Sequence, residues 1–142
     1  MTICRSAEYG LRAIVWLAAH PDTTVSTSGI ADGTQVPPGY LSKVLQSLGR
    51  AGLVESNPGR AGGFRLMRPA DEISVLDVVS AVETLERVPH CPLRLKSHRH
   101  ELCSLHRRLD QVAEMVERAY AEMTIAEIAA ETSPRRAMCE TV

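Results

Sequence analysis

Hydrophobic residues recur at helical spacing over most of this chain, and short polar or glycine-rich segments separate the periodic stretches. Residues 6–20 predict a first helix, which Ser6 can cap. A short second helix is expected over 27–34, and a third from Pro38 to about Ala51, because proline suits the first helical turn. The apolar positions of the third helix, all expected to be buried, are Tyr40, Leu41, Val44, Leu45 and Leu48.

The second half of the chain predicts a β-hairpin and two further helices. Strand-like runs over 53–55 and 64–67 flank a glycine-rich turn, which indicates a hairpin with a long tip. A helix is expected over 75–85, then a loop from Pro89 to about His100, then a long helix over 101–123. Along the long helix, apolar residues alternate in three- and four-residue steps, a coiled-coil-like seam. The seam comprises Leu102, Leu105, Leu109, Val112, Val116, Ala119 and Met123.

This order of elements predicts a mainly α fold with a small β-hairpin wing. It is a winged helix-turn-helix plus a long C-terminal dimerisation helix. We divide the chain into a DNA-binding domain (1–88), a Cys/His sensor loop (89–104), a dimerisation helix with a short cap (105–131) and a flexible tail (132–142). Cys139 falls in that tail, and Cys4 is expected to pack near the first helix.

The composition is that of a soluble globular protein, with 44% hydrophobic and 23% charged residues. No apolar run is long enough for a membrane span, and the first residues lack the features of a secretory signal, so we expect a cytoplasmic protein without membrane partners. The net charge is −1, but it is unevenly distributed. Residues 38–68 carry five basic residues against Glu55 alone, whereas 70–87 carry five acidic residues against Arg87. The basic segment favours a polyanionic partner.

That basic segment contains the helices and hairpin expected to bind double-stranded DNA. The start and exposed face of the third helix would enter the major groove, where Lys43 can reach phosphate or guanine and Gln46 can pair with adenine. Arg60, at the hairpin tip, would enter the minor groove, and Arg50 and Arg65 would neutralise phosphates. The further candidate contacts are Ser28, Pro38, Gly39, Tyr40, Ser42 and Ser47. An adaptor that uses this fold for protein contacts is the alternative; no enzyme motif supports catalysis.

The segments YLSKVLQSLGRAGLV, GRAGGFRL and EISVLDVVSAVE resemble the Rrf2 family of transcription regulators. The resemblance runs from SAEYGLRAIVWLA through the long helix. It implies a regulator, expected to be a repressor, that forms a homodimer through the long helices and binds an imperfect palindrome. Many members carry an arginine before the first wing glycine. Here Pro58 stands there, and Arg60 follows Gly59, so the minor-groove role is transferred to Arg60.

The resemblance also implies an iron–sulfur cluster, because cluster-binding members carry three evenly spaced cysteines before the long helix. This chain keeps the outer two as Cys91 and Cys103, but the middle position is Ser97, a poor iron ligand. His106 has the spacing of a family histidine ligand, and Glu8 matches an acidic residue that some members supply from the partner subunit. Two thiolates with a nitrogen and an oxygen donor favour a two-iron cluster.

The same residues leave other interpretations open. The histidine ligand can be His98 or His100 instead of His106. Two cysteines and two histidines also suffice for zinc, and the loop is long enough to bring Cys91 and Cys103 together as a reversible disulfide. A metal-free member of the family, controlled by a small molecule or a partner, is the remaining alternative.

Overall fold

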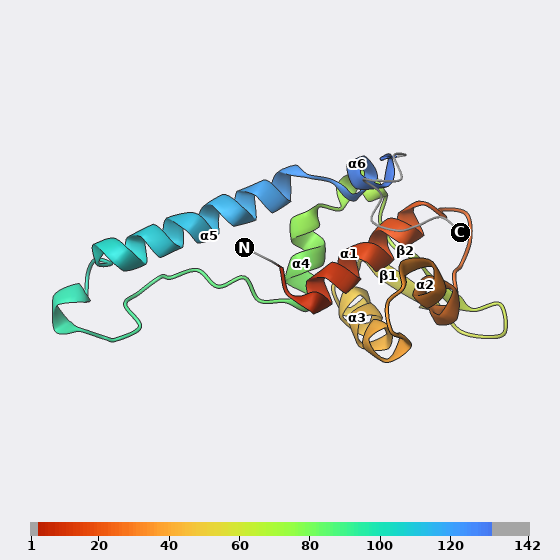
Figure 1. Ribbon diagram of the computed structural model, residues 1–142, viewed down its shortest axis with the longest axis horizontal. Helices are drawn as coiled ribbons and strands as arrows, with labels where there is room; N and C mark the ends of the chain where they lie inside the picture. The colour runs from red at the N-terminus through yellow and green to blue at the C-terminus, as the bar shows by residue number, and fades with distance from the viewer. Residues whose placement is uncertain (1–2, 132–142) are drawn as a thin grey trace.

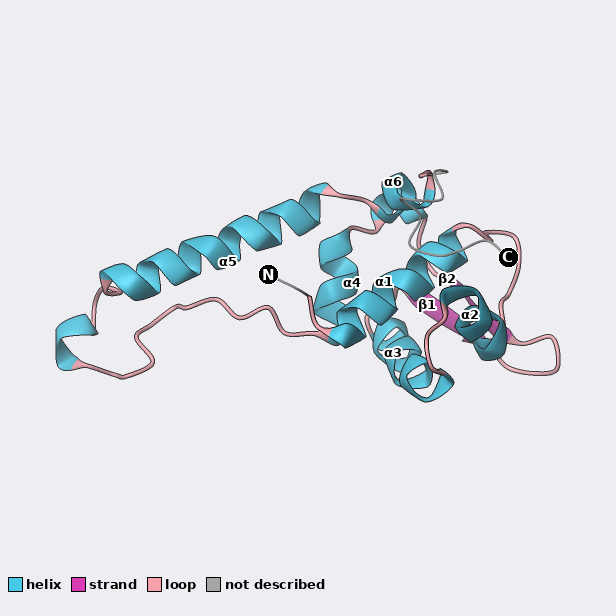
Figure 2. Ribbon diagram, viewed as in Figure 1, coloured by secondary structure: helices cyan, strands magenta, loops and turns pink. Residues whose placement is uncertain are grey.

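The protein consists of a winged-helix head and a long arm that projects from it, as seen in a computed structural model that describes residues 3–131 (Figures 1 and 2). The head contains helices α1, α2, α3, α4 and α6 and the strands β1 and β2. The arm contains α5 and the extended chain that precedes it. Their bounds are α1 Arg5–Ala18, α2 Thr27–Thr34, α3 Pro38–Arg50, β1 Val54–Asn57, β2 Gly63–Leu66, α4 Val75–Val82, α5 Ser104–Glu122 and α6 Ile125–Ala129.

Helix α1 is the centre of the head and packs against α2, α3, α4 and α6. Its apolar residues fall on one broad stripe, with Ile14 fully buried and Leu17 1% exposed. Leu41, Leu45 and Leu48 of α3 meet that stripe and are equally buried. Complete burial of one such side chain stabilises the fold by roughly 1.5–3 kcal/mol. The head therefore completes a hydrophobic core within a single chain.

The chain returns to the head after α5 through a short backbone pairing. The Val75 amide donates to the Met123 carbonyl at 2.9 Å, and the Ile125 amide donates to the Ile73 carbonyl at 2.8 Å. Ile125, which begins α6, is fully buried. This pairing fixes the C-terminal end of α5 on the head, so the helix projects from a defined point.

The hairpin of β1 and β2 is antiparallel, with Val54 opposite Leu66 and Asn57 opposite Gly63. Backbone hydrogen bonds between Val25 and Phe64, 2.8 and 3.0 Å long, attach β2 to the segment before α2. The wing is thus held by the pairing of its two strands and by the backbone hydrogen bonds to the segment before α2.

The arm differs from the head, because no residue of the nineteen in α5 is buried. Most of the predicted seam is exposed: Leu105 is 62% exposed, Leu109 49% and Val112 43%. In the described part of the chain, no helix is long and apolar enough to cross a membrane.

Several local expectations from the sequence are wrong. Helix α1 is capped by Cys4, whose Sγ accepts from the Ala7 amide at 3.4 Å, so Cys4 is an exposed cap and not a packed residue. Ser6 lies inside the helix. Helix α4 was expected to end near residue 85, but it ends at Val82, and the chain becomes extended at Glu83. The long helix begins at Ser104, not residue 101. Cys139 and the predicted flexible tail lie outside the described residues.

Candidate functional site

Helix α3 has one face in the core and one face open to solvent. Leu41, Val44, Leu45 and Leu48 point inward, and the 3.6-residue period leaves the intervening positions outside. The exposed positions are Pro38, Gly39, Tyr40, Ser42, Lys43, Gln46 and Arg50. Tyr40, which the sequence placed in the core, is 54% exposed and lies against Tyr9 with ring centroids 6.1 Å apart.

The turn between α2 and α3 fixes the angle at which α3 is presented. Ser26 caps α2 by accepting from the Gly29 amide at 3.1 Å, and Gln35 ends it in the left-handed conformation with φ 57°. A Cβ at Gly33 would overlap the Trp16 ring, so only glycine allows α2 to pack this closely on α1. Ser28, a candidate contact, is exposed on the outer side of α2.

The wing tip carries Arg60 away from the body of the head. The tip turns at Gly59, whose φ of 112° is one that side chains rarely adopt. Arg60 is exposed at this tip. Arg65 was expected to neutralise phosphate, but its guanidinium is hydrogen-bonded to the Glu55 carboxylate on the opposite strand. A phosphate contact by Arg65 therefore stays a prediction, and it would compete with this exposed ion pair.

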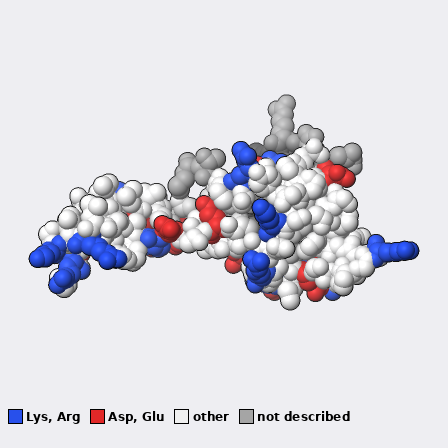
Figure 3. Space-filling view, turned by 90° about the horizontal axis from the view of Figure 1, so that it is seen from below, with Lys and Arg blue, Asp and Glu red and all other residues white. Residues whose placement is uncertain are grey.

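Lys43, Arg50 and Arg60 form no ion pair with any residue in the described range 3–131. Exposed cations without an acidic neighbour can neutralise DNA phosphates without first breaking a contact. Figure 3, which views the molecule from below, shows Lys and Arg side chains spaced over the head and gathered at the far end of the arm. The head thus offers α3 and the wing as a surface for a polyanion.

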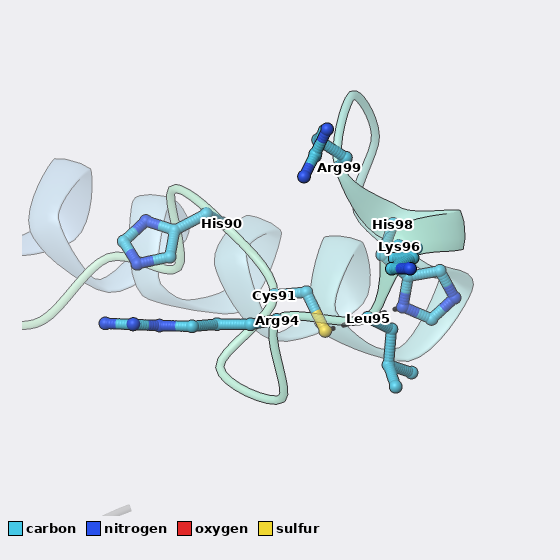
Figure 4. Close-up of a pocket in the computed structure, with 7 residues that line it drawn as sticks. All are labelled: His90, Cys91, Arg94, Leu95, Lys96, His98 and Arg99. Atoms are coloured by element: carbon cyan, nitrogen blue, oxygen red, sulfur yellow. Dashed lines mark hydrogen bonds between the residues drawn. The ribbon is translucent and has the colours of Figure 1, made fainter.

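The loop before α5 contains two cysteine–histidine pairs. Cys91, 3% exposed, has its Sγ 3.4 Å from Nδ1 of His98 (Figure 4). Cys103 precedes the first residue of α5, and its Sγ lies 3.2 Å from Nδ1 of His106, one helical turn later. The structure therefore brings His106 to Cys103, as its spacing predicts, and also brings His98 to Cys91.

The remaining candidate ligands do not join these pairs within one chain. Glu8 is hydrogen-bonded to Arg12 at 2.6 Å on the head, and Ser97 and His100 are exposed. Among the described residues, no three His, Cys, Asp or Glu side chains gather in a group that could hold a metal ion. Thiolate and imidazole donors suit both zinc and iron–sulfur clusters. The donor types thus fit a metal centre, but one chain presents them as separate pairs.

Arg87 attaches the extended chain of the arm to α5. It donates to both carboxylate oxygens of Asp110 at 2.8 Å and to Glu117 at 3.3 Å, and the Val88 amide donates to Asp110 at 2.9 Å. The hydrogen bonds from Arg87 and then Val88 lower the pKa of Asp110 to about 2. Sequence reasoning missed this network. The signal was present, because Asp110, Glu114 and Glu117 share one helical face.

Beside this network an apolar pocket of about 270 Å³ opens between the extended chain and α5. Leu85 lines one side, and Leu109, Val112 and Val116 line the other. The pocket is continuous with the exposed seam of α5. The arm therefore presents an apolar surface that its own chain leaves open.

Comparison with known proteins places this architecture in a family. The family model described as an iron-dependent transcriptional regulator, Rrf2, matches residues 3–131. The protein aau3 of Rhizobium meliloti is 38% identical over 91 residues, which cover 64% of this chain and 59% of that protein. A Mycobacterium tuberculosis protein named as an HTH-type transcriptional regulator is 40% identical over 84 residues, which cover 58% of this chain and 52% of that protein. The matches thus span little more than half the length of these relatives.

Solved structures show the same fold. The T. potens IscR structure has a TM-score of 0.78 with 23% identity, covering 96% of this chain and 91% of that one. The oxidized form of Staphylococcus aureus CymR has a TM-score of 0.74 with 25% identity, covering 94% of this chain and 99% of that one. The predicted winged-helix fold class is confirmed. The chain belongs to the Rrf2 family of transcriptional regulators.

Proposed function

We propose that this chain represses transcription as a homodimer that binds an imperfect palindrome in double-stranded DNA. The observation that carries the proposal is the exposed face of α3, where Lys43 and Gln46 project from a helix whose other face is locked in the core. A recognition helix needs this combination, because the side chains that reach base edges must be held by a rigid support. Such a repressor would act in the cytoplasm.

The exposed residues divide into two roles in this proposal. Gln46 and Lys43 read base edges in the major groove, and Arg60 enters the adjacent minor groove. Arg50 neutralises phosphate. The other exposed candidates near the starts of α2 and α3 contact the DNA backbone and fix the register. They are Ser28, Pro38, Gly39, Tyr40 and Ser42.

The dimer is supported by the arm. Packing of the exposed seam against a second α5 would remove Leu105, Leu109 and Val112 from water. Because burial of apolar surface is favourable, this packing would stabilise a dimer. Two heads joined this way would present two recognition helices, which must lie about 34 Å apart to read successive major grooves on one side of the DNA. Residues 1–88 would then bind DNA, 89–104 would sense the signal, and 105–131 would hold the dimer together.

The effector in this proposal is a two-iron cluster held by Cys91, Cys103, His106 and the partner's Glu8. The contact between Cys103 and His106 supports part of this set. When bound, a cluster would respond to redox state, nitric oxide or iron supply. Cys103 lies at the start of α5 and Glu8 in the first turn of α1. A cluster held by both residues would therefore link the arm of one subunit to the head of the other. Control by thiol chemistry or by a metal-free mechanism is the second candidate, and it is supported by the two separate cysteine–histidine contacts.

A DNA-binding assay with matched glutamine variants tests the first part. The affinity for DNA selected from a random pool by the full chain should fall roughly 5- to 150-fold on Gln46→Ala, because one bidentate base contact is worth about 1–3 kcal/mol. Gln111→Ala removes an equally exposed glutamine from the arm and should have no effect. Failure to enrich any sequence, or equal losses from both variants, would contradict the proposal.

Anaerobic reconstitution tests the second part. The full chain should acquire visible absorption with equal amounts of iron and sulfide, and Cys91→Ala and Cys103→Ala should lose them. Cys4→Ala, which removes only the cap of α1, should retain both. A colourless protein without iron would overturn cluster sensing and leave thiol or metal-free control.

A further inference from the structure

The end of the arm contains a second pocket, next to Cys91. It has a volume of about 230 Å³, and the cations Arg94, Lys96 and Arg99 line it together with His90, His98 and Cys91 (Figure 4). The lining includes no acidic side chain. Leu95 also lines the pocket. A hollow whose charged lining groups are all cationic has the electrostatic character of an anion site.

The three cations have no ion-pair partner within the part of the chain that the structure describes. Nearby arginines of the arm are committed to carboxylates: Arg107 lies 3.7 Å from Glu101, and Arg118 lies 3.5 Å from Glu114. The contrast is local, because these pairs lie on or beside α5. The pocket therefore brings together three cations without ion-pair partners, whereas Arg107 and Arg118 each have a carboxylate partner.

The backbone folds tightly to bring the three cations to one place. The Arg94 amide donates to the Cys91 carbonyl at 3.1 Å, and the Arg99 amide donates to the Lys96 carbonyl at 3.4 Å. Arg94 itself has a φ of 50°, a left-handed conformation that costs a residue with a Cβ on the order of 1 kcal/mol. Such strain is retained at functional sites when the surrounding structure enforces it.

We propose that this pocket binds a small oxyanion, either a free inorganic ion or a metabolite that carries a phosphate, sulfate or carboxylate group. Guanidinium groups bind such oxygens through paired hydrogen bonds, and an ammonium group adds charge. DNA backbone phosphate is the other source of the same chemistry. A small anion fits better, because the site is a hollow and lies at the opposite end of the chain's long axis from the wing (Figure 1). The pocket shares Cys91 with the proposed cluster, but the three cations are not among the proposed cluster ligands.

This site is tested by titrating the isotopically labelled full chain with inorganic phosphate, sulfate and chloride. Nuclear magnetic resonance and calorimetry monitor the binding. Saturable phosphate or sulfate binding is expected, with amide shifts concentrated in residues 90–99, before and after iron chelation. Arg94→Gly removes the guanidinium while suiting the left-handed backbone, so it should fold normally and weaken binding at least about tenfold. Arg99→Gln should do the same, whereas Arg108→Gln, an exposed cation outside the pocket, should change binding less than about twofold.

Three results would overturn the anion site. Amide chemical-shift changes that do not saturate and that spread over all exposed cations would show nonspecific ionic attraction. Equal effects of Arg94→Gly and Arg108→Gln would show that the pocket contributes nothing beyond net charge. Loss of DNA affinity in Arg94→Gly without phosphate binding in the wild-type chain would assign these cations to DNA. None of these results bears on the Gln46 test, so the two proposals fail separately.

Discussion

The head and the arm of this protein differ in how much of their apolar surface they bury. The head buries Ile14, Leu45 and Ile125 in a core drawn from both ends of the described chain. The arm leaves Leu105, Leu109 and Val112 in solvent, and within the described residues its helix α5 contacts the head mainly at α4. The hydrophobic effect is roughly proportional to the area removed from water, so the head gains its stability alone and the arm does not.

The difference teaches where a second chain is needed. The surface proposed for DNA lies on the part that is complete by itself, which gives α3 a rigid base. The surface proposed for dimerisation and the two cysteine–histidine pairs lie on the part that is incomplete. A regulator arranged this way can change the relation between its two heads by acting on the arm, without disturbing either reading surface.

The largest expected effect comes from a cavity in the head. Leu45→Ala should lower the free energy of unfolding by about 2–5 kcal/mol, because Leu45 is 1% exposed and its neighbours cannot collapse fully. Denaturation in urea measures the change. Met115→Ala, at a 69% exposed arm position outside the predicted seam, is the matched control and should leave unfolding of the head unchanged. A comparable loss from both variants would show that head and arm do not differ as described.

Charge on the α5 seam should break the dimer. Val112→Glu places a carboxylate among apolar residues, and we expect the dimer dissociation constant to rise at least about 100-fold, which corresponds to about 2.7 kcal/mol. Analytical ultracentrifugation measures it. Gln111→Glu adds the same charge one residue away, outside the predicted seam, and should leave the dimer intact. A dimer that tolerates Val112→Glu would place the interface elsewhere.

The Asp110 network should give a smaller, pH-dependent effect confined to the arm. The pKa of Asp110 is lowered in the folded chain, so its stabilising contribution is complete above about pH 4 and is lost as the pH falls toward about 2. The protection of the Val88 amide, measured as its exchange rate relative to the intrinsic rate at each pH, should fall over that interval. Asp110→Asn should lower this protection at all pH values and remove its pH dependence. An unchanged Val88 rate in Asp110→Asn would contradict the network.

Much of the head could be predicted from the sequence, because its periodic leucines and valines record which face is buried. Ser26 and Ser74 cap their helices through local contacts, which a sequence pattern can indicate because a capping residue acts on its own neighbouring backbone. Tyr40 was misplaced for a tertiary reason. Its spacing suits burial, but the position lies beside Tyr9 at the edge of the core, where the ring stays half in solvent.

The arm was harder to predict, because its contacts join residues that no local pattern connects. Arg87 meets Asp110 across 23 positions, and the Cys91–His98 contact depends on a tight turn at Arg94. The Cys103–His106 pair was predictable, because three residues make one turn of a helix. The positions of donors along a sequence thus show which pairs form within a helix, but not which pairs a loop brings together.

The most direct test of the account compares the only two lysines of the chain in DNA binding at several salt concentrations. Lys43 lies exposed on α3 and Lys96 lies exposed on the arm, and neither forms an ion pair within residues 3–131. We predict that Lys43→Ala weakens binding to the selected DNA and reduces the slope of log affinity against log salt by about 1, whereas Lys96→Ala changes neither. Equal effects of the two substitutions, or a larger effect of Lys96→Ala, would contradict DNA recognition by the head.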